Sequence, residues 1–170
     1  LAERWPLSDV ELWANGRRMT PKQAKLPTKA ARPLPIAGFD HENTRSAAHG
    51  LSQNWHLSGD IIRGQGFDTW IQRSLSDEQL VNNLNKAIGS IQAIQSAPRA
   101  EDPRLIAKVI LALDPSGPIR LGGFATHVDG IGTTLSVGFE NEVTRNQITE
   151  LLVSGVLKTW LGLQGRVKSE

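Results

Sequence analysis

The sequence contains no cysteine and no tyrosine. Without cysteine there are no disulfide bonds, no thiolate metal ligands and no cysteine nucleophile. The absence fits an oxidising compartment and equally fits many cytosolic proteins, so it does not decide the location. Aromatic residues make up only 5% of the chain. That is too few for a surface on which successive nucleic-acid bases stack.

Long apolar runs are also missing. No run reaches the ~18 apolar residues of a transmembrane helix, so the sequence predicts no transmembrane segment. The first residue is Leu1 rather than Met, as expected after removal of a targeting peptide or for a trimmed chain. An exported or organellar location is therefore one hypothesis, and the sequence does not choose between these origins.

Acidic residues are absent between Asn15 and Gly38, a segment that is rich in basic residues and prolines. Prolines at this density disfavour both a helix and an interior strand. Low hydrophobicity combined with charge of one sign is typical of an extended or disordered chain. We therefore expect residues 1–66 to form an extended basic, Pro-rich N-terminal arm.

The arm carries the residues that we predict to bind partners. Trp5 and Trp13 lie in a segment too short to bury two indoles, so we expect them to dock on this chain's own domain or on a neighbour. The basic candidates are Arg17, Arg18, Lys22, Lys25, Lys29 and Arg32. Residues 17–32 are interpreted either as a solvated linker or as a surface for nucleic acid, an acidic protein groove or lipid head groups. Such phosphate contacts would be salt-sensitive and independent of base sequence.

Apolar residues are dense from Leu75 onward, and residues 67–165 are predicted to form an α+β domain followed by a tail at 166–170. A hydroxyl cap with a Gln three residues later opens helices at 77–97 and 145–163. The first helix buries Leu80 and Leu84. The second is expected to turn five residues inward: Ile148, Leu151, Leu152, Val156 and Trp160.

Three strands are expected between the two helices, at 105–113, 119–128 and 132–140, giving a three-stranded antiparallel meander in the order αβββα. The first strand is ambiguous, because its apolar residues also obey helical spacing after Asp102-Pro103. The turn sequence Asp114-Pro115-Ser116-Gly117 and the β-branched content favour a strand. Asp129-Gly130 is typical of a tight hairpin turn between the other two.

Residues that carry chemistry are sparse. The sequence spacing of the three histidines His41, His49 and His56 matches no familiar metal-binding motif. We therefore predict no bound metal and no cofactor. His127 and Asp129 lie at an expected hairpin tip, where solvent exposure argues against acid–base catalysis. The sequence therefore offers no catalytic residue that we would name.

These features favour a non-enzymatic structural or assembly subunit of a larger complex. It is expected to bind protein neighbours through the N-terminal arm and through an exposed sheet face or edge. The first alternative is a nucleic-acid-associated protein, for example a ribosome-bound one, whose arm follows phosphates. The second alternative is an enzyme with its site in residues 40–60.

Overall fold

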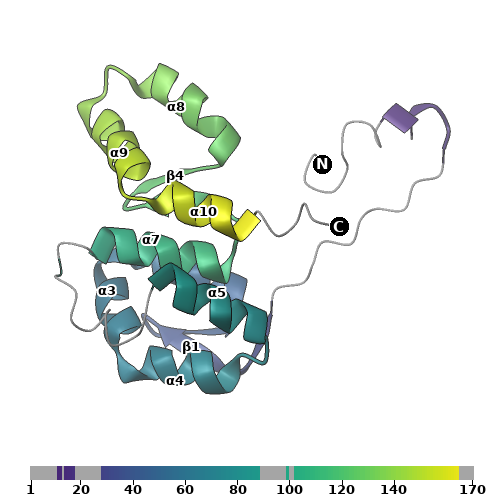
Figure 1. Cartoon of the computed structure of the whole chain (residues 1–170), viewed down its shortest axis with the longest axis vertical. Helices are drawn as coiled ribbons and strands as arrows, with labels where there is room; N and C mark the ends of the chain where they lie inside the picture. Colours follow the sequence, from purple (N-terminus) through teal and green to yellow (C-terminus); the bar gives the residue numbers. More distant parts are fainter. Residues whose placement is uncertain (1–10, 13, 18–27, 89–98, 100–101, 165–170) are drawn as a thin grey trace.

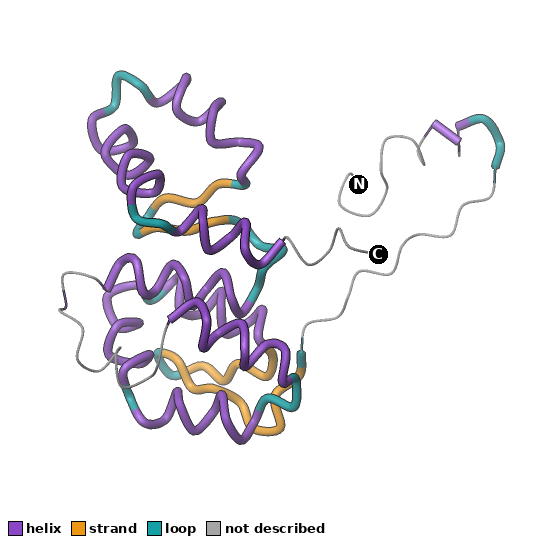
Figure 2. Tube along the Cα trace, viewed as in Figure 1, coloured by secondary structure: helices purple, strands orange, loops and turns teal. Residues whose placement is uncertain are grey.

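The computed structural model of the chain describes residues 11–12, 14–17, 28–88, 99 and 102–164. The fold mixes helices with two small sheets of two strands each (Figures 1 and 2). None of the helices in these ranges is long and apolar enough to cross a membrane. In chain order the elements are β1 (Lys29–Ile36), β2 (Phe39–Asn43), α2 (Thr44–Gln53), α3 (Trp55–Arg63), α4 (Gln65–Ser74), α5 (Glu78–Ile88), α7 (Asp102–Leu113), β3 (Ile119–Leu121), β4 (Phe124–Thr126), the 3₁₀ turn η2 (Val128–Gly130), α8 (Ile131–Gly138), α9 (Glu142–Val153) and α10 (Val156–Gln164).

Residues 28–66 are folded, so the expected extended arm is wrong for this part of it. β1 and β2 form an antiparallel hairpin in which Ile36 pairs with Phe39. Leu34 and Ile36 point into the core at alternate positions and are 3% and 1% exposed. Pro33 and Pro35 face outward, and a two-stranded sheet has no interior strand for proline to disrupt. The rest of the arm, residues 1–10, 13 and 18–27, lies outside the described residues.

The helices α2, α3 and α4 complete the first half of the molecule. The Asn43 side chain accepts from the Ser46 backbone N–H, and the Ser46 hydroxyl oxygen accepts from the Asn43 N–H, so a capping box starts α2. The Ser58 hydroxyl donates to the Leu51 carbonyl oxygen at 2.8 Å and joins α3 to α2. In α4 the side chains of Phe67, Trp70 and Ile71 have helical spacing and are buried.

Residues 105–113 are helical, so the predicted strand is wrong and the helical alternative is right. α7 runs through the centre of the molecule, and seven of its residues are buried: Ile106, Ala107, Val109, Ile110, Leu111, Ala112 and Leu113. The predicted turn does follow, since the Gly117 N–H donates to the Asp114 carbonyl oxygen at 3.0 Å. It joins a helix to a strand rather than two strands.

α7 approaches α3 closely. Arg63 of α3 and Asp102 of α7 form an ion pair, and both side chains are less than a fifth exposed. A Cβ atom added at Gly59 would lie 2.5 Å from the Asp102 carboxylate oxygen. Glycine at this position therefore permits the ion pair to form between the two helices.

The three-stranded meander is not formed. The predicted middle strand, 119–128, folds back on itself at Gly122-Gly123, and Leu121 pairs with Phe124 in the β3–β4 hairpin. No third strand joins this hairpin among the described residues: 132–138 lie in α8, and 139–140 lie in the turn that follows it. Leu135, Val137 and Phe139 alternate with other residues as in a strand with one buried face, yet the first two lie in α8 and the third follows it.

The two predicted flanking helices are present with altered ends. α5 confirms the first over Glu78–Ile88, with Leu80 8% and Leu84 0% exposed, while residues 89–97 lie outside the described ranges. Its N-terminal cap is the Asp77 carboxylate rather than the predicted hydroxyl. The second helix starts after the Asn141 cap and breaks at Gly155, whose φ is +76°, into α9 and α10.

A hairpin followed by three helices occurs twice among the described residues. The first unit is β1–β2–α2–α3–α4 and the second is β3–β4–α8–α9–α10, with η2 added after its hairpin. Both hairpins have a two-residue turn and the same register, because Ile36 pairs with Phe39 as Leu121 pairs with Phe124. Sequence identities occupy matching places in the two units, namely Pro33 and Pro118, Gly38 and Gly123, Phe39 and Phe124, Thr69 and Thr159, and Trp70 and Trp160.

Candidate functional site

The predicted basic residues are only partly described. Arg17, Lys29 and Arg32 have exposed side chains. Lys29 and Arg32 lie on β1, so the folded first unit holds them in place. The other five predicted partner-binding residues lie outside the described ranges: Trp5, Trp13, Arg18, Lys22 and Lys25. Their role in partner binding stays a prediction.

The histidines of the 40–60 segment are distributed over three elements. His41 on β2 is half-buried against Gly50, whereas His49 on α2 and His56 on α3 are exposed. Burial lowers the pKa of His41, nearby His49 lowers it further, and Asp40 opposes the shift. Within the described part of the chain, no three His, Cys, Asp or Glu side chains gather to hold a metal ion.

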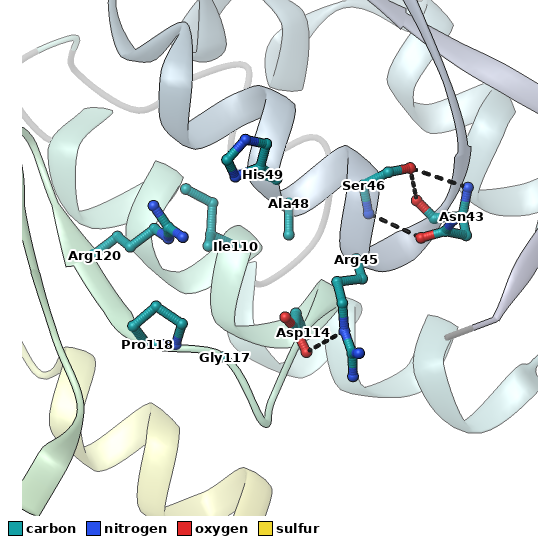
Figure 3. Close-up of a pocket in the computed structure, with 10 residues that line it drawn as sticks. All are labelled: Asn43, Arg45, Ser46, Ala48, His49, Ile110, Asp114, Gly117, Pro118 and Arg120. Atoms are coloured by element: carbon teal, nitrogen blue, oxygen red, sulfur yellow. Dashed lines mark hydrogen bonds and ion pairs between the residues drawn. The ribbon is translucent and has the colours of Figure 1, made fainter. Parts of the chain in front are cut away.

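A cavity of about 530 Å³ lies between the first unit and the turn that leads into the second (Figure 3). Its volume is within the range of small-molecule pockets. The walls come from the start of α2, the end of α7 and the strand β3. The lining residues are Asn43, Arg45, Ser46, Ala48, His49, Ile110, Asp114, Gly117, Pro118 and Arg120.

The polar groups of this cavity mostly bind one another. The Nε of Arg45 lies 3.5 Å from the Asp114 carboxylate, and the guanidinium also donates to the Ser116 hydroxyl at 3.3 Å. The Ser46 hydroxyl donates to the Asn43 carbonyl oxygen inside the helix cap. The Ser46 hydroxyl therefore stabilises the helix cap. It does not form a nucleophile–base pair with His49, which also lines the cavity.

The second unit exposes most of the large apolar side chains that face solvent. Eight such side chains are exposed among the described residues, and six of them lie in or beside its three helices. We call these six the C-terminal apolar surface: Val137, Phe139, Val143, Leu152, Val153 and Leu161. Their exposed fractions reach 84% at Val137. Figure 1 shows α8 and α9 at the end of the molecule opposite α4. The concentration of exposed large apolar residues in one unit makes that unit the candidate for an interaction surface.

Equivalent positions in the two units differ sharply in burial. Matching Trp70 with Trp160 places Ile62 at Leu152 and Ile71 at Leu161. Ile62 and Ile71 are 2% and 0% exposed, whereas Leu152 and Leu161 are 54% and 61% exposed. Apolar positions that form the core of the first unit are therefore open in the second.

Sequence reasoning placed Leu152 in the core and did not find this surface. Amphipathic periodicity identifies an apolar face but does not say whether anything covers it. The repeated Thr-Trp pair at 69–70 and 159–160 was the available signal. It would have aligned the two units and shown that Leu152 and Leu161 occupy the places of Ile62 and Ile71.

Comparison with protein-family models, with curated proteins and with solved structures finds no match for this chain.

Proposed function

We propose that this protein is a non-enzymatic subunit of a larger assembly and binds a protein neighbour through the C-terminal apolar surface. The N-terminal arm, with Trp5, Trp13 and its basic residues, adds contacts to neighbours in this proposal. The observation that carries the proposal is the exposure of six large apolar side chains on one unit.

The physical argument rests on the cost of leaving apolar surface in water. Burying it on association contributes roughly 25 cal/mol for each Å² removed from solvent. Val137 and Val153, at 84% and 68% exposure, have most of their surface left to bury. Among the large apolar residues of the equivalent helices in the first unit, only Leu57 counts as exposed, at 40%, so the second unit has the greater need of a neighbour.

Helices rather than strands supply this surface. Both sheets are two-stranded hairpins, and the third strand expected to offer an exposed sheet face is the helix α8. α8 contains no charged residue, and none of its residues is buried. Ile131 and Leu135 pack partly against the second core cluster, and the rest of this uncharged helix is available for contact with another protein.

Photo-crosslinking in the cells that express the protein tests the proposal. A photoreactive phenylalanine analogue replaces Val137 on α8, and the matched control places it at Gln72, an exposed position on α4 of the first unit. We expect a protein adduct of defined mass from position 137 and none from position 72. Equal labelling at both positions, or an adduct to nucleic acid, would contradict the proposal.

A salt titration of the purified complex distinguishes the apolar surface from phosphate contacts of the arm. Binding through apolar side chains is expected to change little with ionic strength. Binding of the basic residues to phosphates would weaken steeply as salt rises, because condensed counterions are released.

A further inference from the structure

α7 separates two apolar clusters and contributes to both. Ile106 and Val109 pack in the hydrophobic cluster that forms the core of the first unit. Ala107 and Leu111 pack in the cluster that forms the core of the second unit. On its first side α7 packs against α2, α3 and α5, and on its other side against β3 and α10. α7 thus covers α2 and α3, the first two helices of the unit that precedes it.

The corresponding helices of the second unit are covered less completely, although α7 contacts α9 through the Arg104–Glu150 ion pair at 2.8 Å. α2 buries five residues, and α8, which takes its place in the chain order, buries none. α9 buries Ile148 and Leu151 in the cluster that includes α7. Its Leu152 stays 54% exposed, although the equivalent Ile62 shares a core cluster with Ile106 and Val109 of α7.

We propose that α8 and α9 bind an amphipathic helix from a protein partner, which takes the position that α7 holds over α2 and α3. This inference rests on the proposed function and specifies the partner's chemistry. The partner helix carries apolar residues at the spacing i, i+3, i+4 and i+7, as α7 does with Ile106, Val109, Ile110 and Leu113.

The charged residues near the C-terminal apolar surface indicate which charge the partner helix carries beside its apolar stripe. Glu140 and Glu142 stand between Phe139 and Val143, and both are exposed. Arg145 is engaged locally, since its guanidinium donates to the Phe139 carbonyl oxygen at 3.1 Å and lies 5.9 Å from the centre of the Phe139 ring. Arg145 keeps its charge in these contacts, so the two carboxylates against one guanidinium give this stretch a net charge of −1. The partner helix in this proposal carries basic residues beside its apolar stripe.

A peptide of this protein's own α7 is the probe. The peptide Pro103–Leu113 has the required stripe, and its only charged side chains are Arg104 and Lys108. Labelled with a fluorophore and titrated with the full chain, it is expected to show a saturable rise in anisotropy with one-to-one stoichiometry. A peptide with Ile106→Asp and Ile110→Asp should not bind.

Variants of the full chain locate the binding face. Leu152→Asp and, separately, Val137→Asp are expected to weaken peptide binding at least about tenfold, as central apolar contacts do. Phe39→Asp is the matched control, because Phe39 is an apolar residue of the first unit with 72% exposure. Thermal melting establishes that each variant is folded. The positions are exposed, so the substitutions leave the packed core unchanged.

Two results would overturn the proposal. One is the absence of saturable binding to the unmodified chain. The other is equal binding to the Leu152→Asp, Val137→Asp and unmodified chains, because the peptide would then exchange with α7 or attach elsewhere. Failure of the peptide with a surviving crosslink at position 137 would reject the helical partner alone. Peptide binding without a cellular adduct would instead reject the proposed function.

Discussion

The indole Nε1 of Trp70 donates a hydrogen bond to the backbone carbonyl oxygen of Arg32, with a nitrogen–oxygen distance of 3.0 Å. The bond joins α4 to β1 across the core of the first unit. Trp70 is 4% exposed, and its ring stacks with that of Phe67 at a centroid separation of 6.0 Å. The strand that carries Arg32 is thereby fixed to the helical layer.

Replacing this indole tests how far the hydrogen bond holds the hairpin in place. Trp70→Phe is expected to lower the free energy of unfolding by ~1–3 kcal/mol, because it leaves the Arg32 carbonyl without this donor. Trp160→Phe, at the equivalent place in the second unit, is the control and should cost less, since Trp160 is only partly buried. Urea unfolding measures both, and an equal loss would contradict the special role of Trp70.

A pair of leucine substitutions tests the difference in burial between the units. Leu84→Ala is expected to destabilise by ~2–5 kcal/mol, because Leu84 is fully buried in α5 and its removal leaves a cavity. Leu161→Ala in α10 should change stability by less than about 0.5 kcal/mol, the usual range at exposed positions. Comparable losses for the two variants in chemical denaturation would mean that Leu161 is covered in the isolated chain.

Helical periodicity predicted the parts of the fold that have one buried face. Leu80 and Leu84 lie four residues apart and are both buried in α5, and Phe67, Trp70 and Ile71 behave in the same way in α4. In each case polar residues occupy the opposite side, so the helical stripe is visible in the sequence.

The same reasoning failed for α7 because this helix is buried on more than one side. With Ile106, Ala107, Ile110 and Leu111 all buried, the sequence shows an almost continuous apolar run. Such a run fits a buried strand as well as a buried helix, and the β-branched residues then favoured the wrong choice. The turn at Asp114 was correct and did not resolve the ambiguity.

The prolines concealed the first hairpin. Leu34 and Ile36 alternate with Pro33 and Pro35, which is the pattern of a strand with one buried face. The local preference against strands was overridden because the hairpin needs few ladder bonds and gains burial against α4. The C-terminal apolar surface was missed for a different reason, since exposure at Leu152 depends on what lies above it and not on its own sequence.

The Arg63–Asp102 ion pair provides a test of the contact between α3 and α7. Asp102→Ala is expected to cost ~3–5 kcal/mol of stability, because it removes the carboxylate of an ion pair whose side chains are only 12% and 17% exposed. The control is Asp60→Ala, which removes the carboxylate of the Arg99–Asp60 pair. Those side chains are 73% and 61% exposed, and the expected cost is below about 1 kcal/mol. If the two substitutions cost the same, the α3–α7 pair would not contribute to the core.

The lowered pKa of His41 makes stability depend on pH. Its causes are burial first and then the proximity of His49, with Asp40 opposing them. As the pH falls below the ordinary value of 6.5, the unfolded chain takes up this proton before the folded chain does. The unfolded state then binds more protons, so the contribution of His41 to stability falls with pH until the folded form also titrates.

Two histidine substitutions isolate this effect. His41→Gln is expected to flatten the change in urea midpoint between about pH 8 and about pH 5, the range in which histidine changes charge. His49→Gln should raise the pKa of His41 measured by NMR titration, because it removes a neighbour that disfavours the imidazolium. His56→Gln, at an exposed position on α3, serves as the control and should leave both measurements unchanged. A pH dependence that persists undiminished in the His41→Gln variant would assign it to other groups, because the titrating imidazole would be gone.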